Sequence, residues 1–206
     1  MGLISRFRYW QAVRRERRID ILTAKAGDIC DGQQYDLLFL HQRGVVRVKA
    51  TGQSITRIYA GVENLIRKRF DVVVKPGTYF VSSGGHQNMV TTAEYSFTMA
   101  PCSKEHLNIN AACINAGRPI PGEKDRFCGV ARVPDEVARF LEASRLADPM
   151  VIQAGVWALT DGYSGHQVQT HLVSRDRYGN TRQAVSDSQV AEARKILNSL
   201  GIRHNL

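Results

Sequence analysis

The 206-residue chain has no long hydrophobic run. A membrane-spanning helix needs about 18–20 consecutive apolar residues, whereas the longest mostly apolar stretch, Met150 to Leu159, has ten. The N-terminus is basic but is not followed by the continuous apolar segment of a secretory signal. We therefore expect no transmembrane segment and a cytoplasmic location, with peripheral contact to a membrane as an option. A signal peptide preceding this sequence would make the location extracellular instead.

The sequence also lacks the common catalytic and nucleotide-binding motifs. It has no Gly-rich loop followed by Lys and Ser or Thr, no GxSxG segment and no HExxH segment. These absences argue against phosphate-loop enzymes, α/β-hydrolases and zinc proteases, and we expect a non-catalytic protein. An enzyme that uses a loop histidine such as His86 or His166 is the weaker alternative.

Cysteine is scarce and is not arranged for metal binding. The four cysteines are Cys30, Cys102, Cys113 and Cys128. None of them forms a CxxC pair or a Cys/His pair at zinc spacing, so we expect no metal and no other cofactor. Without a secretion signal, free thiols in a reducing compartment are favoured over two disulfides.

Acidic residues are too few to balance the basic ones, and the formal net charge is +9. Residues 1–18 contain six arginines and a single glutamate, so five of these charges lie in this segment. Leu3, Phe7, Trp10 and Arg14 share one stripe at helical spacing, which predicts a basic amphipathic helix. Its candidate partner-binding residues are Arg6, Arg8, Trp10, Arg14, Arg15, Arg17 and Arg18.

A helix of this kind suits an acidic protein partner or an anionic surface, including a membrane or, less specifically, nucleic acid. The alternative is a helix packed on the protein body with a solvated basic face. No RNP motif, helix-turn-helix spacing or zinc finger is present, so nucleic-acid binding would be electrostatic and salt-sensitive. The Arg-rich segment 175–182 is a further place where phosphate could bind, although a solvated turn is favoured there.

Strand patterns dominate residues 19–117. Val46, Val48 and Ala50 alternate with Arg47 and Lys49, which is typical of a half-buried strand. Similar short segments, separated by turn residues, occur at 19–23, 36–40, 55–59, 70–75, 78–82, 89–99 and 106–114. About eight short strands in sequence predict an antiparallel β-sandwich, either Ig-like or jelly-roll-like.

The pattern changes after residue 117. Two prolines and two glycines in segment 116–123 form a connector, and helical spacing follows it. We expect helices after Pro134, across residues 150–159 and after Ser186, where Ser186 and Gln189 fit a capping box. Residues 118–206 are therefore predicted to form a small helical subdomain packed against the sandwich as one continuous α+β unit.

The predicted helix at 150–159 is apolar on nearly every face and should be buried. It carries one strongly polar side chain, Gln153, with Trp157 one turn later. A buried amide without partners costs about 1–3 kcal/mol, so we expect Gln153 to be hydrogen-bonded. The favoured interpretation is that it bonds a strand backbone and clamps the helical part onto the sandwich.

The segment Ile152-Gln-Ala-Gly-Val-Trp157, followed by Leu159-Thr-Asp161, resembles the Gln-containing helix (TQxAIW type) of bacterial thioester domains. In that family of surface adhesins, a Cys from a preceding strand condenses with the Gln to an internal thioester. The resemblance implies that Gln153 would supply the acyl group and Cys113, on the inward phase of a strand, the thiol. It further implies covalent capture of a host amine, as the alternative to a non-covalent interaction module.

Overall fold

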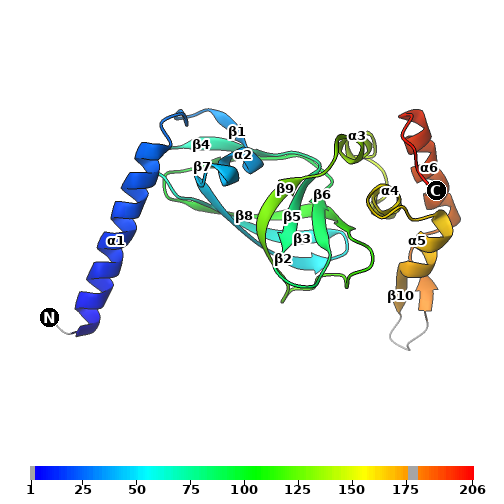
Figure 1. Ribbon diagram of the computed structural model, residues 1–206, viewed down its shortest axis with the longest axis horizontal. Coiled ribbons are helices and arrows are strands. Elements are labelled where there is room, and N and C mark those ends of the chain that lie inside the picture. The colour runs from blue at the N-terminus through cyan, green and yellow to red at the C-terminus, as the bar shows by residue number, and fades with distance from the viewer. Residues whose placement is uncertain (1–2, 176–180) are drawn as a thin grey trace.

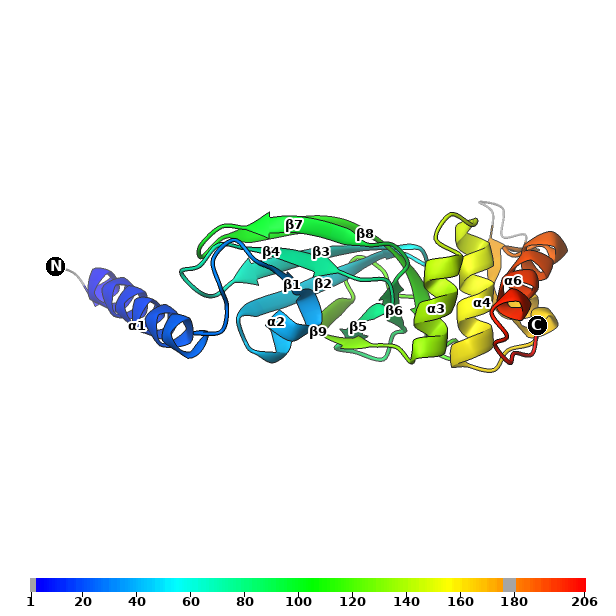
Figure 2. The same ribbon diagram turned by 90° about the horizontal axis from the view of Figure 1, so that it is seen from above.

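The computed structural model describes residues 3–175 and 181–206, without the side chains of residues 3–10, 13, 174 and 175. The molecule is elongated, with helix α1 (Leu3–Lys25) extending from one end of a β-barrel and a group of helices covering the other end (Figures 1 and 2). Helix α1 and the C-terminus therefore lie at opposite ends of the molecule (Figure 1).

Six antiparallel strands close the barrel in the order β2-β3-β8-β6-β5-β9. Their bounds are β2 (Val46–Ser54), β3 (Arg57–Asn64), β5 (Thr78–Ser82), β6 (Asn88–Thr91), β8 (Lys104–Ile114) and β9 (Arg126–Arg132). The predicted β-sandwich, Ig-like or jelly-roll-like, is therefore wrong. The reason is β9, which pairs with both β2 and β5 and so joins the two edges that a sandwich would leave open.

Strand β9 follows residue 117, within the range that was expected to be helical. Its buried residues Phe127 and Val130 do not keep a strict two-residue alternation, because its register with β5 shifts opposite Val81 and Ser82. A bulged strand of this kind leaves a weak period in the sequence.

Two other segments that were predicted as strands are helical. Residues 19–23 belong to α1, and residues 37–40 belong to α2 (Leu37–Gln42). The start of α2 is set by Asp36, whose side chain accepts a hydrogen bond of 2.8 Å from the N–H of Leu38. The predicted strands at 46–50, 78–82 and 106–114 are confirmed.

A small mixed sheet lies at the α1 end of the barrel (Figure 1). It contains β1 (Gln34–Asp36), β4 (Phe70–Val74) and β7 (Tyr95–Met99). Strand β1 is parallel to β4, and β4 is antiparallel to β7. The connection between β3 and β4 brings Leu65 and Arg67 beside α1, and this contact determines where the candidate site lies.

The other end of the barrel is covered by α3 (Asp135–Ala143), α4 (Pro149–Thr160), α5 (Gly165–His171) and α6 (Asp187–Ser199), with a hairpin of β10 (Val173–Arg175) and β11 (Thr181–Gln183). The α+β class and the C-terminal helical part are confirmed. Asp148 caps α4 through the N–H of Met150, and Ser186 forms the expected capping box with Gln189. One hydrophobic cluster fills the barrel and continues into α2, β4 and helices α4, α5 and α6. A second cluster lies between β6, β8 and helices α3, α4 and α6.

Among the residues that the structure describes, none of the helices combines the length and apolar content required to cross a bilayer.

Candidate anion-binding site

Helix α1 is fixed to the barrel through the β3–β4 connection. The Arg67 guanidinium forms ion pairs with Glu16 and, at 3.0 Å, with Asp20, and the Arg67 N–H donates to the Thr23 hydroxyl. Glu16, Asp20 and Thr23 lie on one stripe of the helix because they are four and three residues apart. The hydrogen bond to Asp20 and the nearby Glu16 raise the pKa of Arg67. Lys68 adds hydrogen bonds to the carbonyls of Ala26 and Ile29 just beyond the helix.

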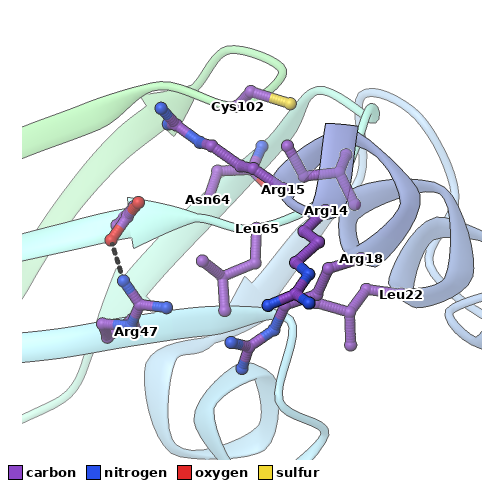
Figure 3. Close-up of a pocket in the computed structure, with 10 residues that line it drawn as sticks. Arg14, Arg15, Arg18, Leu22, Arg47, Asn64, Leu65 and Cys102 are labelled. Carbon is purple, nitrogen blue, oxygen red and sulfur yellow. Dashed lines mark hydrogen bonds and ion pairs between the residues drawn. The ribbon is translucent and has the colours of Figure 1, made fainter. Parts of the chain in front are cut away.

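This attachment turns a different side of α1 toward the barrel and creates a hollow of about 490 Å³. The hollow is lined by Arg14, Arg15, Arg18, Ile19 and Leu22 from α1 and by Arg47, Glu63, Asn64, Leu65 and Cys102 from the barrel side. Figure 3 shows the arginine side chains of α1 reaching across the gap toward β2 and β3. We call this hollow the arginine pocket.

The arginine pocket contains four guanidinium groups and one carboxylate. The carboxylate of Glu63 is already engaged, because it accepts a 2.8 Å hydrogen bond from Arg47 on the neighbouring strand. Within the described part of the chain, Arg14, Arg15 and Arg18 have no acidic partner. Guanidinium groups donate paired hydrogen bonds that match phosphate and carboxylate oxygens, so the pocket has the chemistry of an anion site.

The structure brings together three of the residues that the sequence predicted for anion binding, namely Arg14, Arg15 and Arg18. Arg17 is exposed but does not line the pocket. The side chains of Arg6, Arg8 and Trp10 lie outside the described residues, as does most of the Arg-rich segment 175–182.

Sequence reasoning missed the barrel half of the pocket. The alternation in β2 did show that Arg47 and Lys49 face outward, and their exposure confirms this. What the alternation could not show is that Arg47 faces α1, because that proximity depends on how Arg67 holds the helix.

The second pair of residues singled out by the sequence, Cys113 and Gln153, also meets in the structure. Gln153 is fully buried on α4. Its Oε1 accepts a 2.8 Å hydrogen bond from the Cys113 N–H, and its Nε2 donates a 2.9 Å hydrogen bond to the Cys113 carbonyl. The expectation that Gln153 bonds a strand backbone is confirmed.

The position of this contact explains why an amide is needed there. Strand β8 pairs with β3 only as far as Asn110, and the next hydrogen bond on that edge joins the Ala111 N–H to the Thr56 carbonyl. Alternate residues of a strand direct their N–H groups to the same edge. Cys113 therefore presents an N–H and a carbonyl where no strand remains, and the Gln153 amide supplies the missing donor and acceptor.

Two more side chains continue this attachment beyond the end of β8. Asp161 accepts a 2.9 Å hydrogen bond from the Ala116 N–H, and His171 Nε2 lies 3.0 Å from the Ala116 carbonyl oxygen. The rings of Trp157, Tyr163 and His171 contact one another edge to face. The helical part is thus bound to the barrel by polar contacts at the end of β8 as well as by apolar packing.

The Cys113 side chain faces the barrel interior. Its Sγ lies 3.2 Å from Met89 Sδ, whereas its neighbours Ala112 and Ile114 belong to the cluster beneath the helices. Burial raises the pKa of the thiol to about 12, so it is protonated at neutral pH. All four cysteines are free.

The two histidines considered for an enzyme, His86 and His166, lie on different elements, between β5 and β6 and on α5. His86 contacts Asp125 at 3.1 Å, and His166 is exposed on α5. In the described ranges 3–175 and 181–206, no group of three His, Cys, Asp or Glu side chains is arranged to hold a metal ion.

No family model, curated protein or solved structure matches the chain.

Proposed function

We propose that this protein is a non-catalytic binding module that recognises phosphate-bearing polyanions through the arginine pocket. The observation that carries the proposal is the convergence of Arg14, Arg15 and Arg18, which have no acidic partner in the described structure, on one hollow with the Arg47–Glu63 pair.

The distribution of charge on α1 supports this function. Its two described acids, Glu16 and Asp20, both face Arg67 and hold the helix in place. Arg14 and Arg18 are four residues apart on another side, where like charges destabilise a helix by about 0.2–0.5 kcal/mol per pair. A bound anion would remove that repulsion, so the ligand and the helix would stabilise each other.

Inorganic polyphosphate is a suitable first probe because it is a polyanion without bases or acyl chains. We expect the full chain to bind it, and the double variant Arg14→Glu/Arg18→Glu to bind at least about tenfold more weakly, since a hydrogen bond to a charged group contributes about 1.5–3 kcal/mol. The matched control is Arg17→Glu/Lys25→Glu, which makes the same charge change on the same helix outside the pocket.

The control should lower the affinity only by about twofold, through long-range charge that salt screens. Equal losses in the two double variants would mean that net charge alone attracts the polyanion, and the pocket would have no specific role. Calorimetric titration at two salt concentrations measures both affinities.

A second candidate function rests on the adjacency of Cys113 and Gln153. In a thioester, Cys113 Sγ would bond to Gln153 Cδ, the Cδ–Nε2 bond would break, and ammonia would leave with the thiol proton. The product would then acylate an amine. This chemistry requires the Gln153 amide to leave the Cys113 backbone and the thiol to turn out of the barrel interior.

Intact mass of the denatured, unreduced protein distinguishes the two roles of Gln153. A thioester makes the chain one ammonia lighter than its sequence, and methylamine then adds to it in wild type but not in Gln153→Ala. The unmodified sequence mass would assign Gln153 to the clamp alone and would leave the arginine pocket as the functional site.

A further inference from the structure

A second hollow, of about 350 Å³, lies on the outer face of β9, β2, β3 and β8. It is lined by Lys49, Ala50, Thr51, Tyr59, Gly61, Ser83, Lys104, His106, Arg126, Phe127 and Cys128. No acid contributes to this lining, and the side chains of Lys49, Lys104 and Arg126 have no partner in the described structure. The hollow is therefore a second cationic surface.

Two rings distinguish this hollow from the arginine pocket. Tyr59 and His106 stack with centroids 5.2 Å apart and an interplanar angle of 13°, and Tyr59 is 39% exposed. Gly61 pairs with His106 across the strands, and a Cβ there would lie 3.2 Å from Lys104 Cε. The absence of a side chain at Gly61 therefore lets the Lys104 and His106 side chains lie close over this strand, beside the exposed ring of Tyr59.

The two hollows are consecutive along the same strands. Arg47 pairs with Glu63 in the arginine pocket, and the next outward position on β2, Lys49, pairs with Gly61 in the second hollow. Outward side chains two residues apart on a strand are separated by only about 7 Å. Together the hollows form one outward track, with guanidinium groups near α1 and stacked rings at its other end.

We infer that the polyanion bound by this track is single-stranded nucleic acid, with phosphates at the arginine pocket and at Lys49 and Lys104, and a base stacked on Tyr59. This inference rests on the proposed function and adds the ligand class to it. Proteins that bind single strands combine a positive groove with aromatic platforms, and stacking tolerates every base because each has a flat face. A base paired in a duplex could not stack in this way.

The same features favour nucleic acid over a membrane surface. An interfacial site inserts large apolar side chains among the lipids. Tyr59 is the only exposed large hydrophobic side chain among the described residues of the track, and it lies flat against His106. A polyanion without bases would use the cations but would gain nothing from the ring pair.

The test measures binding of the full chain to a fluorescent oligodeoxythymidine of about 15 nucleotides, near the upper end of the 4–16 nucleotides that a small barrel domain covers. Tyr59→Leu retains apolar surface but removes the ring. We expect it to weaken oligonucleotide binding by about five- to hundredfold, the equivalent of about 1–3 kcal/mol per stacked base. Tyr59→Phe retains the ring and should stay within about twofold of wild type by the same reasoning.

The matched control is Phe39→Leu, because Phe39 is an aromatic on α2 with 38% exposure, away from the track. It should leave oligonucleotide affinity unchanged. Tyr59→Leu should also leave polyphosphate affinity unchanged, since the probe has no base to stack. Circular dichroism of each variant confirms that the barrel is folded.

The other outcomes separate a failure of the single-strand inference from a failure of the proposed function. If Tyr59→Leu binds the oligonucleotide as wild type does, or if a duplex of equal length binds as tightly, the single-strand inference is overturned while the proposed polyanion function stands. If vesicles containing phosphatidylserine bind and the oligonucleotide does not, the ligand is a membrane surface. If neither polyphosphate nor oligonucleotide binds, the inference and the proposed function both fail.

Discussion

Replacing Gln153 by alanine tests how the barrel and the helices are held together. The substitution removes the side-chain amide that bonds the buried backbone of Cys113, so the N–H and the carbonyl of Cys113 are left without hydrogen bonds. An unsatisfied buried polar group costs about 1–3 kcal/mol, so the two groups together cost roughly 2–6 kcal/mol. Total stabilities of about 5–15 kcal/mol make this a large loss.

Urea denaturation followed by circular dichroism gives the magnitude. With a slope of about 2 kcal/mol per molar urea, a loss of about 4 kcal/mol lowers the midpoint by roughly 2 M. The exposed Gln53, whose amide lies 3.4 Å from Asn108 on the barrel surface, provides the control. Gln53→Ala should change stability by no more than about 0.5 kcal/mol.

Gln153→Glu sharpens the same test because it keeps the size of the side chain. A carboxylate can accept from the Cys113 N–H but cannot donate to the Cys113 carbonyl, whereas the protonated carboxyl can do both. The new group should have a pKa raised above about 4.3 in the folded state. Its stabilising contribution is then present below that pH and is lost as the pH rises through the raised value.

A midpoint for Gln153→Ala within about 0.5 M urea of wild type, the equivalent of about 1 kcal/mol, would refute this reasoning. It would mean that water or another group satisfies Cys113 once the amide is gone. A pH-independent stability of Gln153→Glu would contradict the assigned donor in the same way.

Three further results are expected. Gly155→Ala should destabilise the protein by more than about 1–3 kcal/mol in thermal melts, because the new Cβ would lie 2.0 Å from Phe140 Cζ. This clash should outweigh alanine's better helix propensity. Gly85→Ala is the control and should be neutral, since a Cβ at Gly85 would have no atom within 4 Å. Stability should fall between pH 9.0 and about 12, because the buried Cys113 thiol stays protonated while the unfolded thiol ionises, and Cys113→Ala should flatten that part of the pH profile in urea titrations. Arg67→Ala should expose α1 to faster tryptic cleavage and faster amide exchange, since the contacts that hold the helix to the barrel are lost; unchanged protection would place the anchor elsewhere.

Local signals in the sequence predicted the features that depend on nearby residues. Asp148 caps α4, Ser186 and Gln189 form the capping box of α6, and the alternation at residues 46–50 places Arg47 outward. Each of these depends on residues within about one helical turn or a few strand positions, so the pattern carries the answer.

The alternation of apolar and polar residues could not predict that the strands close into a barrel. A strand has the same two-residue period in a sandwich and in a barrel, so alternation cannot distinguish them. The decision depends on β9, which follows the connector at 116–123 and pairs with strands that precede it by about 50 to 75 residues. Residues 19–23 were wrongly predicted as a strand for a different reason. A short apolar run fits both a strand and a buried helical segment, and here it continues the helix α1.

The sequence by itself determined that residues 1–18 concentrate positive charge, that α4 is buried and that the buried Gln153 side chain needs a hydrogen-bond partner. Only the tertiary structure decided that the partner is the backbone of Cys113, and that Arg14 and Arg18 share a pocket with Arg47. The physical reason is common to both. Charge and apolarity are properties of single residues and their near neighbours, whereas a binding site is a set of distances between segments that folding brings together.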